Sequence, residues 1–311
     1  IEPDNRVPIL FPSTEMGQGS ETGLPSILAD ELDADWDQVV VEQLNEDDRR
    51  FGNPAFGHIL YTAGSSGIYG YFDVLRSAGA HLREMLKVRA AQEWSVMSDS
   101  LTTAANTVTH AASGRSLSYG EIVALPGFAE TTLEKAAALK AYEDFTLIGT
   151  DIPRRDIPAK STGEAKFAID VRVPDMLYAT VTRAPVEGET IVALDDAAAR
   201  AVDGVVDVVT LPDGVAVVAE TLHASFVGRF TLDVTWSESS PFRAHGTETT
   251  LASYAETVRN NQAGAAWRSV GDAASAVDAA EKSFQVLYTS DYAYHAQLEP
   301  IAVVAHVITA R

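Results

Sequence analysis

Apolar residues near the start of the chain follow first a strand pattern and then a helix pattern. Val7, Ile9 and Phe11 alternate with other residues, which predicts a short β-strand that runs into a turn over 12–19. A helix is expected to begin at Ser20, because the apolar positions after it recur with helical spacing, namely Leu24, Ile27, Leu28 and Leu32.

A second strand, loop and helix follow in the same order. Residues 39–41 are predicted to form a strand, and the Gly-rich stretch 51–70 leads into a second amphipathic helix. The residues that share its face are Phe72, Leu75, Gly79, Leu82 and Leu86. The unit of strand, glycine loop and helix is therefore predicted to occur twice.

Turn-forming residues predict the elements that follow the second helix and the end of the first domain. Residues 101–119 alternate like a β-hairpin with Ser113-Gly114 at its turn. Ser118 and Glu121 resemble a capping box at a helix start. Residues 142–163 carry two prolines, mixed charge and little periodicity, so we expect the main linker there.

The residues after the linker are predicted to form a small α+β domain. Short strands are expected over 166–171, 177–183, 205–211, 215–219 and 232–236, and brief helices over 195–202 and 221–227. Further on, the pattern predicts an irregular stretch over 237–268, a helix over 273–282 and two strands around a histidine-rich bend over 284–307. Both ends of the chain interrupt a strand pattern, so we expect that both are cut.

Composition and charge narrow the classes of function. The chain has 311 residues, enough for two domains, and its 23 Lys or Arg against 44 Asp or Glu give a net charge of −21. This acidity argues against a protein that wraps a nucleic-acid backbone. No apolar run approaches the length that crosses a bilayer. The absence of cysteine excludes disulfides, thiolate zinc sites, a cysteine nucleophile and iron–sulfur ligation by this chain.

The first candidate binding loop precedes the first helix and consists of Gly17, Gln18, Gly19 and Ser20. Glycine lets a backbone approach a ligand closely, and the N–H groups of a first helical turn favour an anion. This loop could therefore hold a phosphate without a lysine. The competing interpretation, which an isolated Gly-x-Gly favours, is that the two glycines only shape a strand-to-helix turn.

The second candidate loop precedes the second helix and consists of Gly64, Ser65, Ser66 and Gly67. Its small residues, backbone N–H groups and hydroxyls could meet the phosphates or polar edges of the same extended ligand. A solvated Ser/Gly loop explains the composition equally well.

The third candidate is the segment 292–300, in which His295 and Glu299 accompany two tyrosines before the apolar strand 301–305. Hydrogen-bonding groups in a dry setting suit a pocket wall, although a buried Glu that caps the turn before Pro300 is the simpler interpretation. The sequence has no His-x-x-x-His, no carboxylate cluster with metal-ligand spacing and no Gly-x-Ser-x-Gly elbow. No catalytic residue and no metal ligand is therefore assigned.

Taken in this order, the segments resemble the large, molybdopterin-binding subunits of the isoquinoline 1-oxidoreductase and aldehyde dehydrogenase group, in the xanthine dehydrogenase family of molybdenum hydroxylases. The stretches that carry the resemblance extend over nearly the whole chain: 15–20, 28–36, 51–57, 64–66, 75–80, 116–121, 145–149, 153–154, 158–163, 174–179, 183–185 and 295–300. Their combination is specific, although no single stretch is.

The resemblance implies an α+β fold. An amino-terminal molybdopterin-binding α/β domain (1–141) and a linker (142–163) would precede an α/β hammerhead domain (164–240), and 241–311 would hold a linker and the first strands of a further molybdenum-binding domain. The chain is thereby identified as the amino-terminal part of a large subunit that oxidises an N-heteroaromatic compound or an aldehyde with water-derived oxygen.

The resemblance also implies a cofactor, site residues and partners. The cofactor is molybdopterin cytosine dinucleotide, whose phosphates and pterin edge would meet the two glycine loops; Glu299 matches a substrate-orienting carboxylate, with His295 beside it. The implied partners are a carboxy-terminal molybdenum-binding chain or segment, a small subunit carrying [2Fe–2S] clusters, a small-molecule substrate and, as a further candidate, a cytochrome c subunit.

Two departures from the family pattern bear on activity. Family members commonly carry Gly-Gly-Ser-x-Ser-x-Arg in the second loop, whereas residues 63–69 here read Ala-Gly-Ser-Ser-Gly-Ile-Tyr and lack the arginine. The family's general-base glutamate lies outside these residues, so the chain alone is expected to be inactive. A non-catalytic structural or cofactor-loading protein of the same fold and a generic phosphate-binding module stay as alternatives, and periplasmic and cytoplasmic locations are both open.

Overall fold

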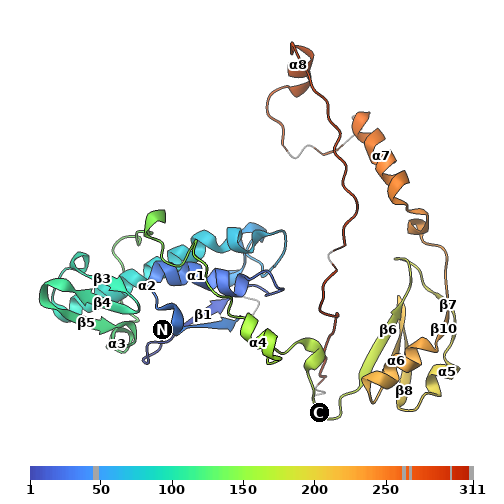
Figure 1. Cartoon of the computed structure of the whole chain (residues 1–311), viewed down its shortest axis with the longest axis horizontal. Coiled ribbons are helices and arrows are strands. Elements are labelled where there is room, and N and C mark those ends of the chain that lie inside the picture. The colour runs from blue at the N-terminus through green and yellow to red at the C-terminus, as the bar shows by residue number, and fades with distance from the viewer. Residues whose placement is uncertain (45–48, 261–263, 266–267, 295, 308–311) are drawn as a thin grey trace. The chain divides into compact units, whose positions relative to one another are not determined.

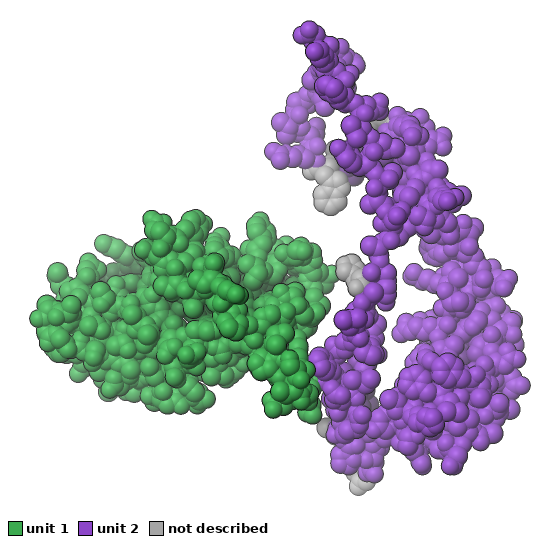
Figure 2. All heavy atoms as spheres, viewed as in Figure 1, with its two compact units in different colours: residues 1–166 green, residues 167–311 purple. Residues whose placement is uncertain are grey.

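The computed structural model describes residues 1–44, 49–260, 264–265, 268–294 and 296–307. The chain divides into two compact units, residues 1–166 and 167–311, which Figure 2 shows in different colours. Both units contain helices and strands (Figure 1), which confirms the predicted mixture of helix and sheet. The finer domain boundaries predicted from the sequence stay predictions.

Unit 1 is built on two parallel strands, each followed by a helix. β1 (Val7–Phe11) pairs with β2 (Val39–Gln43). α1 (Ser20–Leu32) follows β1, and α2 (Ser66–Trp94) follows β2. The prediction that strand, loop and helix occur twice is therefore confirmed.

α1 is the central element of unit 1, because it is buried against both the strands and α2. Two apolar clusters hold it in place. One gathers around Ile9, Leu32 and Leu86, and the other consists of Phe11, Leu24, Ile27, Tyr71 and Leu75. Gly79 lets the two helices approach closely, since a Cβ at this position would lie 2.4 Å from the Leu28 carbonyl oxygen.

A small antiparallel sheet and two short helices complete unit 1. β3 (Thr102–Ala104), β4 (Thr107–His110) and β5 (Arg115–Ser118) form a meander, so the predicted single hairpin is wrong: a further turn at Ala105 and Asn106 divides its first arm. α3 (Tyr119–Val123) begins with the predicted capping box of Ser118 and Glu121. α4 (Ile157–Thr162) lies in the stretch predicted to be a linker.

Unit 2 contains two antiparallel sheets. The larger has the strand order β6 (Tyr178–Arg183), β9 (Gly214–Ala219) and β8 (Val205–Leu211), and the smaller pairs β7 (Ile191–Asp195) with β10 (Asp233–Trp236). The helices are α5 (Ala197–Arg200), α6 (Leu222–Phe230), α7 (Thr247–Arg259) and α8 (Ala273–Asp278). The core of this unit gathers around Ala199, Val208, Val215 and Val217.

Three predictions for unit 2 are wrong, and β7 was not predicted. Residues 166–171 contain a short 3₁₀ helix in place of a strand, because the Asp170 carboxylate accepts the Phe167 N–H at 3.1 Å and closes a turn. The stretch 237–268 was predicted to be irregular but contains α7. The described residues of 284–307 form no strand: their apolar residues alternate, but a strand also needs a neighbouring strand to bond with, and the described part of the chain supplies none.

Candidate functional site

The two candidate loops lie at the same edge of unit 1. β1 and β2 are parallel, and each runs from its carboxyl end through a loop into the N-terminus of a helix. In sheets of this kind, ligands bind in the crevice outside the carboxyl ends of the strands. Both helices therefore start at this edge, and Figure 1 shows α1 and α2 side by side.

A direct hydrogen-bonded link joins the segments that lead into α1 and α2. Thr62 Oγ1 lies 2.9 Å from Ser13 Oγ and accepts the Thr14 N–H at 3.0 Å. Nearby, the Tyr71 hydroxyl donates to the Phe51 carbonyl oxygen at 3.0 Å, and burial raises the pKa of this phenol to about 12. The segments that lead into the two loops are therefore held together in the folded chain.

A cavity of about 430 Å³ lies at the start of α1. Three groups of residues line it: the first turns of α1 with the two residues that precede the helix (among them Gln18, Gly19 and Thr22), Ile68 and Phe72 of α2, and the segment 147–152 together with Arg154. Of the eight residues predicted to bind a cofactor, Gln18 and Gly19 line this cavity, while Gly17, Ser20 and the second loop lie outside its lining.

The N–H groups of the first loop already have an acceptor within the chain. Glu15 Oε1 accepts the N–H groups of Gly17 at 2.8 Å and Gly19 at 3.0 Å, and Glu15 Oε2 accepts the N–H of Glu21 at 2.9 Å. Both glycines have positive φ angles, 99° and 85°, which the turn requires. An external anion could bind these N–H groups only after displacing the Glu15 carboxylate, a constraint that the sequence interpretation did not foresee.

The Gln18 side chain holds the first loop together. Its Nε2 donates to the Thr14 carbonyl oxygen and to Ser20 Oγ, both at 2.7 Å, and its Oε1 accepts the Met16 N–H at 2.5 Å. Both N–H groups of this amide are thus used within the loop. Gln18 can donate to a ligand only by giving up one of these contacts.

The second loop forms the entry to α2. Gly64 and Ser65 have positive φ angles of 60° and 54°, and Ser66 begins the helix. Ser66 Oγ donates to the Ala63 carbonyl oxygen at 2.7 Å, while Asn53 Nδ2 donates to the Ser66 carbonyl oxygen at 3.2 Å. Ser65 is exposed, and Gly67 has open space around its Cα. Their role in binding stays a prediction.

Arg154 contributes a positive charge to the cavity. Its Nη1 donates to the Gly17 carbonyl oxygen at 2.9 Å, and its Nη2 lies 3.4 Å from Glu15 Oε1. Asp156 fixes the guanidinium through a pair of hydrogen bonds of 2.9 and 2.5 Å. These bonds hold the pKa of the Asp156 carboxyl well below its usual range and raise the pKa of Arg154. Sequence reasoning assigned Arg154 no role, because nothing local links it to the loop 137 positions away.

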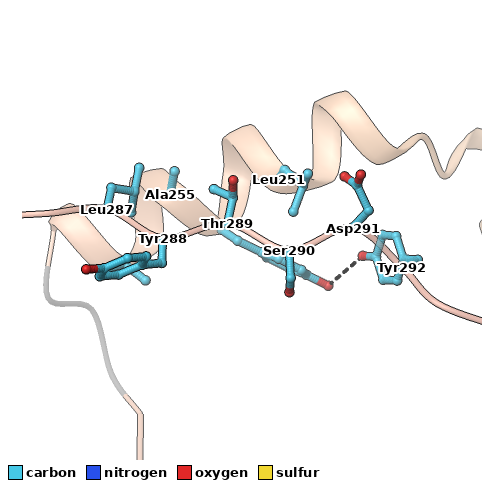
Figure 3. Close-up of a pocket in the computed structure, with 10 residues that line it drawn as sticks. Leu251, Ala255, Leu287, Tyr288, Thr289, Ser290, Asp291 and Tyr292 are labelled. Atoms are coloured by element: carbon cyan, nitrogen blue, oxygen red, sulfur yellow. Dashed lines mark hydrogen bonds between the residues drawn. The ribbon is translucent and has the colours of Figure 1, made fainter.

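A second, open cavity of about 330 Å³ lies within unit 2. It is formed where residues 287–292 run along α7 (Figure 3), and the Tyr292 hydroxyl lies 3.4 Å from that of Tyr254. Glu299 is exposed and lines neither cavity, and His295 lies outside the described residues. The predicted substrate-pocket role of these two residues stays a prediction.

The described residues contain neither a cluster of metal-ligating side chains nor a helix that could cross a membrane. No group of three or more His, Cys, Asp or Glu side chains is placed to hold a metal ion among the residues with described positions. Within the same part of the chain, no helix combines the length and the apolar character that crossing a bilayer requires.

The chain is similar to a family of cofactor-binding domains and to subunits of several oxidoreductases. The profile of the "Molybdopterin cofactor-binding domain" family matches residues 1–169. The beta subunit of isoquinoline 1-oxidoreductase from Brevundimonas diminuta is 37% identical over 98% of this chain and 44% of its own length. A membrane-bound aldehyde dehydrogenase (pyrroloquinoline-quinone) of Gluconacetobacter polyoxogenes is 31% identical over 98% of this chain and 40% of its own.

A third relative, a nicotinate dehydrogenase subunit from Pseudomonas putida, is 31% identical over 94% of this chain and 24% of its own length. The chain thus spans less than half the length of each of these three relatives.

Proposed function

The chain belongs to the family of molybdopterin cofactor-binding domains, as the sequence resemblance predicted, and from this premise we propose that unit 1 supplies part of the cradle for a molybdenum cofactor. The cofactor form that we propose is molybdopterin cytosine dinucleotide. The assembly that contains the chain would be an oxidoreductase. No catalytic base is assigned to these residues.

One observation carries the proposal: two parallel strands lead both glycine loops to one edge of unit 1, where Gln18 and Gly19 of the first loop line a cavity of about 430 Å³ together with Ile68 and Phe72 of α2. A nucleotide-bearing pterin is long enough and polar enough to need two such loops. The polar lining residues of the cavity suit such a ligand: Thr22 carries a hydroxyl, Arg154 a positive charge, and Gln18 an amide that can donate to the cofactor once it gives up a contact within the chain.

The Glu15 carboxylate indicates which part of the cofactor each loop would bind. Because it already accepts hydrogen bonds from the N–H groups of the first loop, we assign Gly17–Ser20 to the uncharged pterin edge and Gly64–Gly67 to the phosphates. When bound, such a cofactor supplies the two-electron oxidation of a substrate with oxygen from water. The chain's own residues bind and orient the cofactor.

The names of the relatives lead to a proposed substrate class and to proposed partners. The three relatives are named for isoquinoline, an aldehyde and nicotinate, so an N-heteroaromatic compound or an aldehyde is the proposed substrate class. Glu299 and His295 would face it. The missing cofactor contacts would come from a carboxy-terminal polypeptide, and electrons would leave through a small [2Fe–2S] subunit, with a cytochrome c subunit as a further acceptor.

Metal and nucleotide content of the purified assembly test the proposal. About one molybdenum and one cytidine nucleotide per assembly are expected, and Gln18→Ala should lower both because the first loop loses its internal amide. A complete assembly that contains neither would instead support a non-catalytic structural or cofactor-loading role. Nucleotide binding by the chain alone, with no copurifying polypeptide, would support a generic phosphate-binding module.

A further inference from the structure

Residues 138–150, here called the strap, are fastened to α1 and α2 by buried charges. Arg83 Nη2 donates to the Ala138 carbonyl oxygen and Arg76 Nη2 to the Lys140 carbonyl oxygen, both at 2.7 Å. The carboxylate of Glu31, a fully buried residue of α1, lies 2.7 Å from Arg76 Nε and 3.4 Å from Arg83 Nη1. One end of the strap is thereby fixed across the two helices.

Asp30, the neighbour of Glu31 on α1, fixes the other end. Its carboxylate accepts three consecutive backbone N–H groups, those of Thr146 at 3.1 Å, Leu147 at 2.9 Å and Ile148 at 2.8 Å. Lys140 Nζ lies 3.0 Å from the same carboxylate. The residue is only 1% exposed, so each of its strong hydrogen bonds counts toward keeping a charge inside the protein.

The ionised form of Asp30 is the one that the strap stabilises. Burial alone would raise the pKa of this carboxyl, but the bonds from the Ile148 and Leu147 N–H groups, followed by the Lys140 ammonium, outweigh burial and leave the pKa lowered. The negative charge of Asp30 and the position of the strap therefore depend on each other.

The strap leads directly into one wall of the cavity. The lining includes Leu147 and Ile148, which Asp30 holds, and continues through Gly149 to Ile152. The opposite side is formed by Gln18, Gly19 and Thr22 of the first loop and α1. Asp30 does not line the cavity itself, but the three hydrogen bonds that it accepts fix the position of this wall.

We propose that Asp30 is a positioning residue of the cofactor site, which holds the strap so that residues 147–152 close one side of the cavity. This assignment rests on the proposed function. It concerns how tightly a bound cofactor is kept and not the reaction itself.

The test compares Asp30→Asn with Asp33→Asn in the purified assembly. Asp33 also pairs with Lys140 Nζ, at 2.6 Å, but its carboxylate takes no N–H group of 146–148, so it controls for loss of a charge next to the same helix. We expect D30N to release molybdenum roughly ten-fold faster than the unmodified assembly, as removal of an orienting contact around a metal site commonly does. D33N should release it at the unmodified rate. Equal rates for D30N and the unmodified assembly, or equal acceleration in both variants, would overturn the assignment.

Hydrogen exchange supplies a readout that does not depend on turnover. The N–H groups of 146–148 should exchange faster in D30N than in D33N when the two variants have the same urea midpoint, so that a difference in global stability cannot explain the result. Should D30N fail to fold, the unmodified assembly decides: loading with cofactor should slow exchange at 146–148, and unchanged exchange would count against the assignment. An unmodified assembly that never contains cofactor overturns the proposed function itself, an outcome distinct from normal loading with unaltered release in D30N.

Discussion

The hydroxyl oxygens of Ser13 and Thr62 lie 2.9 Å apart, although 49 positions separate these residues in the sequence. Ser13 follows β1 and Thr62 precedes α2, so the pair connects the segments that lead into the two loops that the sequence assigned to one ligand. Thr62 Oγ1 also accepts the Thr14 N–H at 3.0 Å. The Thr62 hydroxyl therefore joins the segments that precede the two loops.

Thr62→Val should weaken this contact without changing the shape of the side chain. The Thr14 N–H and the Ser13 hydroxyl lose their partner, and the expected cost is about 1 kcal/mol in the free energy of unfolding, measured by urea denaturation. Molybdenum content of the assembly should fall as well. Thr132→Val, at an exposed position, is the matched control. Normal molybdenum content in T62V would show that binding does not need the contact.

Glu15→Ala should convert the first loop into a site for external anions. Three N–H groups at the start of α1 lose their internal acceptor, and the N-terminus of a helix favours negative charge. We expect sulfate to raise the thermal midpoint of E15A more than that of the unmodified chain. The measurement is a sulfate titration by scanning fluorimetry, with chloride at equal ionic strength as the reference.

The control for this titration is Glu130→Ala, which removes an exposed carboxylate elsewhere in unit 1. Sulfate stabilises most proteins by exclusion from their surface, so only the difference between the variants is informative. Equal shifts in E15A and E130A would mean that the freed N–H groups do not attract anions.

The sequence predicted those parts of the fold that depend on local spacing. The start of α1 and the capping box at Ser118 were found, because periodicity and caps are properties of neighbouring residues, whereas α2 begins at Ser66, inside the stretch 51–70 that was predicted to precede it. α7 could have been found in the same way. Its apolar residues Leu251, Tyr254, Ala255 and Val258 recur at helical spacing, but the polar composition around them concealed the pattern.

The contacts that shape the site could not be predicted, since they join residues far apart in the chain. Asp30 has the sequence context of an ordinary polar residue near a helix end, and its burial depends on the Ile148 N–H, 118 positions away. Glu15 lies in the stretch 15–20 that carries the family resemblance, yet nothing in a linear pattern shows that its side chain turns back onto Gly17 and Gly19. Such pairings exist only after the chain has folded.

Gly79→Ala should destabilise unit 1 by forcing α1 and α2 apart. The new methyl group would lie 2.4 Å from the Leu28 carbonyl oxygen and 2.8 Å from Glu31 Cβ, and overpacking of this kind costs about 1–3 kcal/mol. Urea denaturation measures the loss. Gly67→Ala is the contrast, because no atom lies within 4 Å of its added Cβ and alanine favours the helix by up to about 1 kcal/mol. If G79A proved more stable than G67A, the close packing of the two helices would be contradicted.

The ion pairs of Asp156 should make stability depend on acid pH. The hydrogen bonds from Arg154 lower the pKa of this carboxyl, burial acts in the opposite sense, and Lys160 at 2.7 Å lowers it further. A carboxyl with a lowered pKa in the folded state adds stability above its ordinary pKa of about 4 and loses it progressively as the pH falls toward the folded value.

Asp156→Asn removes this contribution, so the gap in urea midpoint between the unmodified chain and D156N should be widest near about pH 6 and narrow toward about pH 3. Glu21 titrates in the opposite sense, because burial and then the Asp156 charge raise its pKa. Measuring the same pair of proteins in a Glu21→Gln background isolates the Asp156 effect. Asp151→Asn, at an exposed position, is the charge-matched control. A gap that stays constant with pH would show that the bonds to Arg154 and Lys160 do not stabilise the fold.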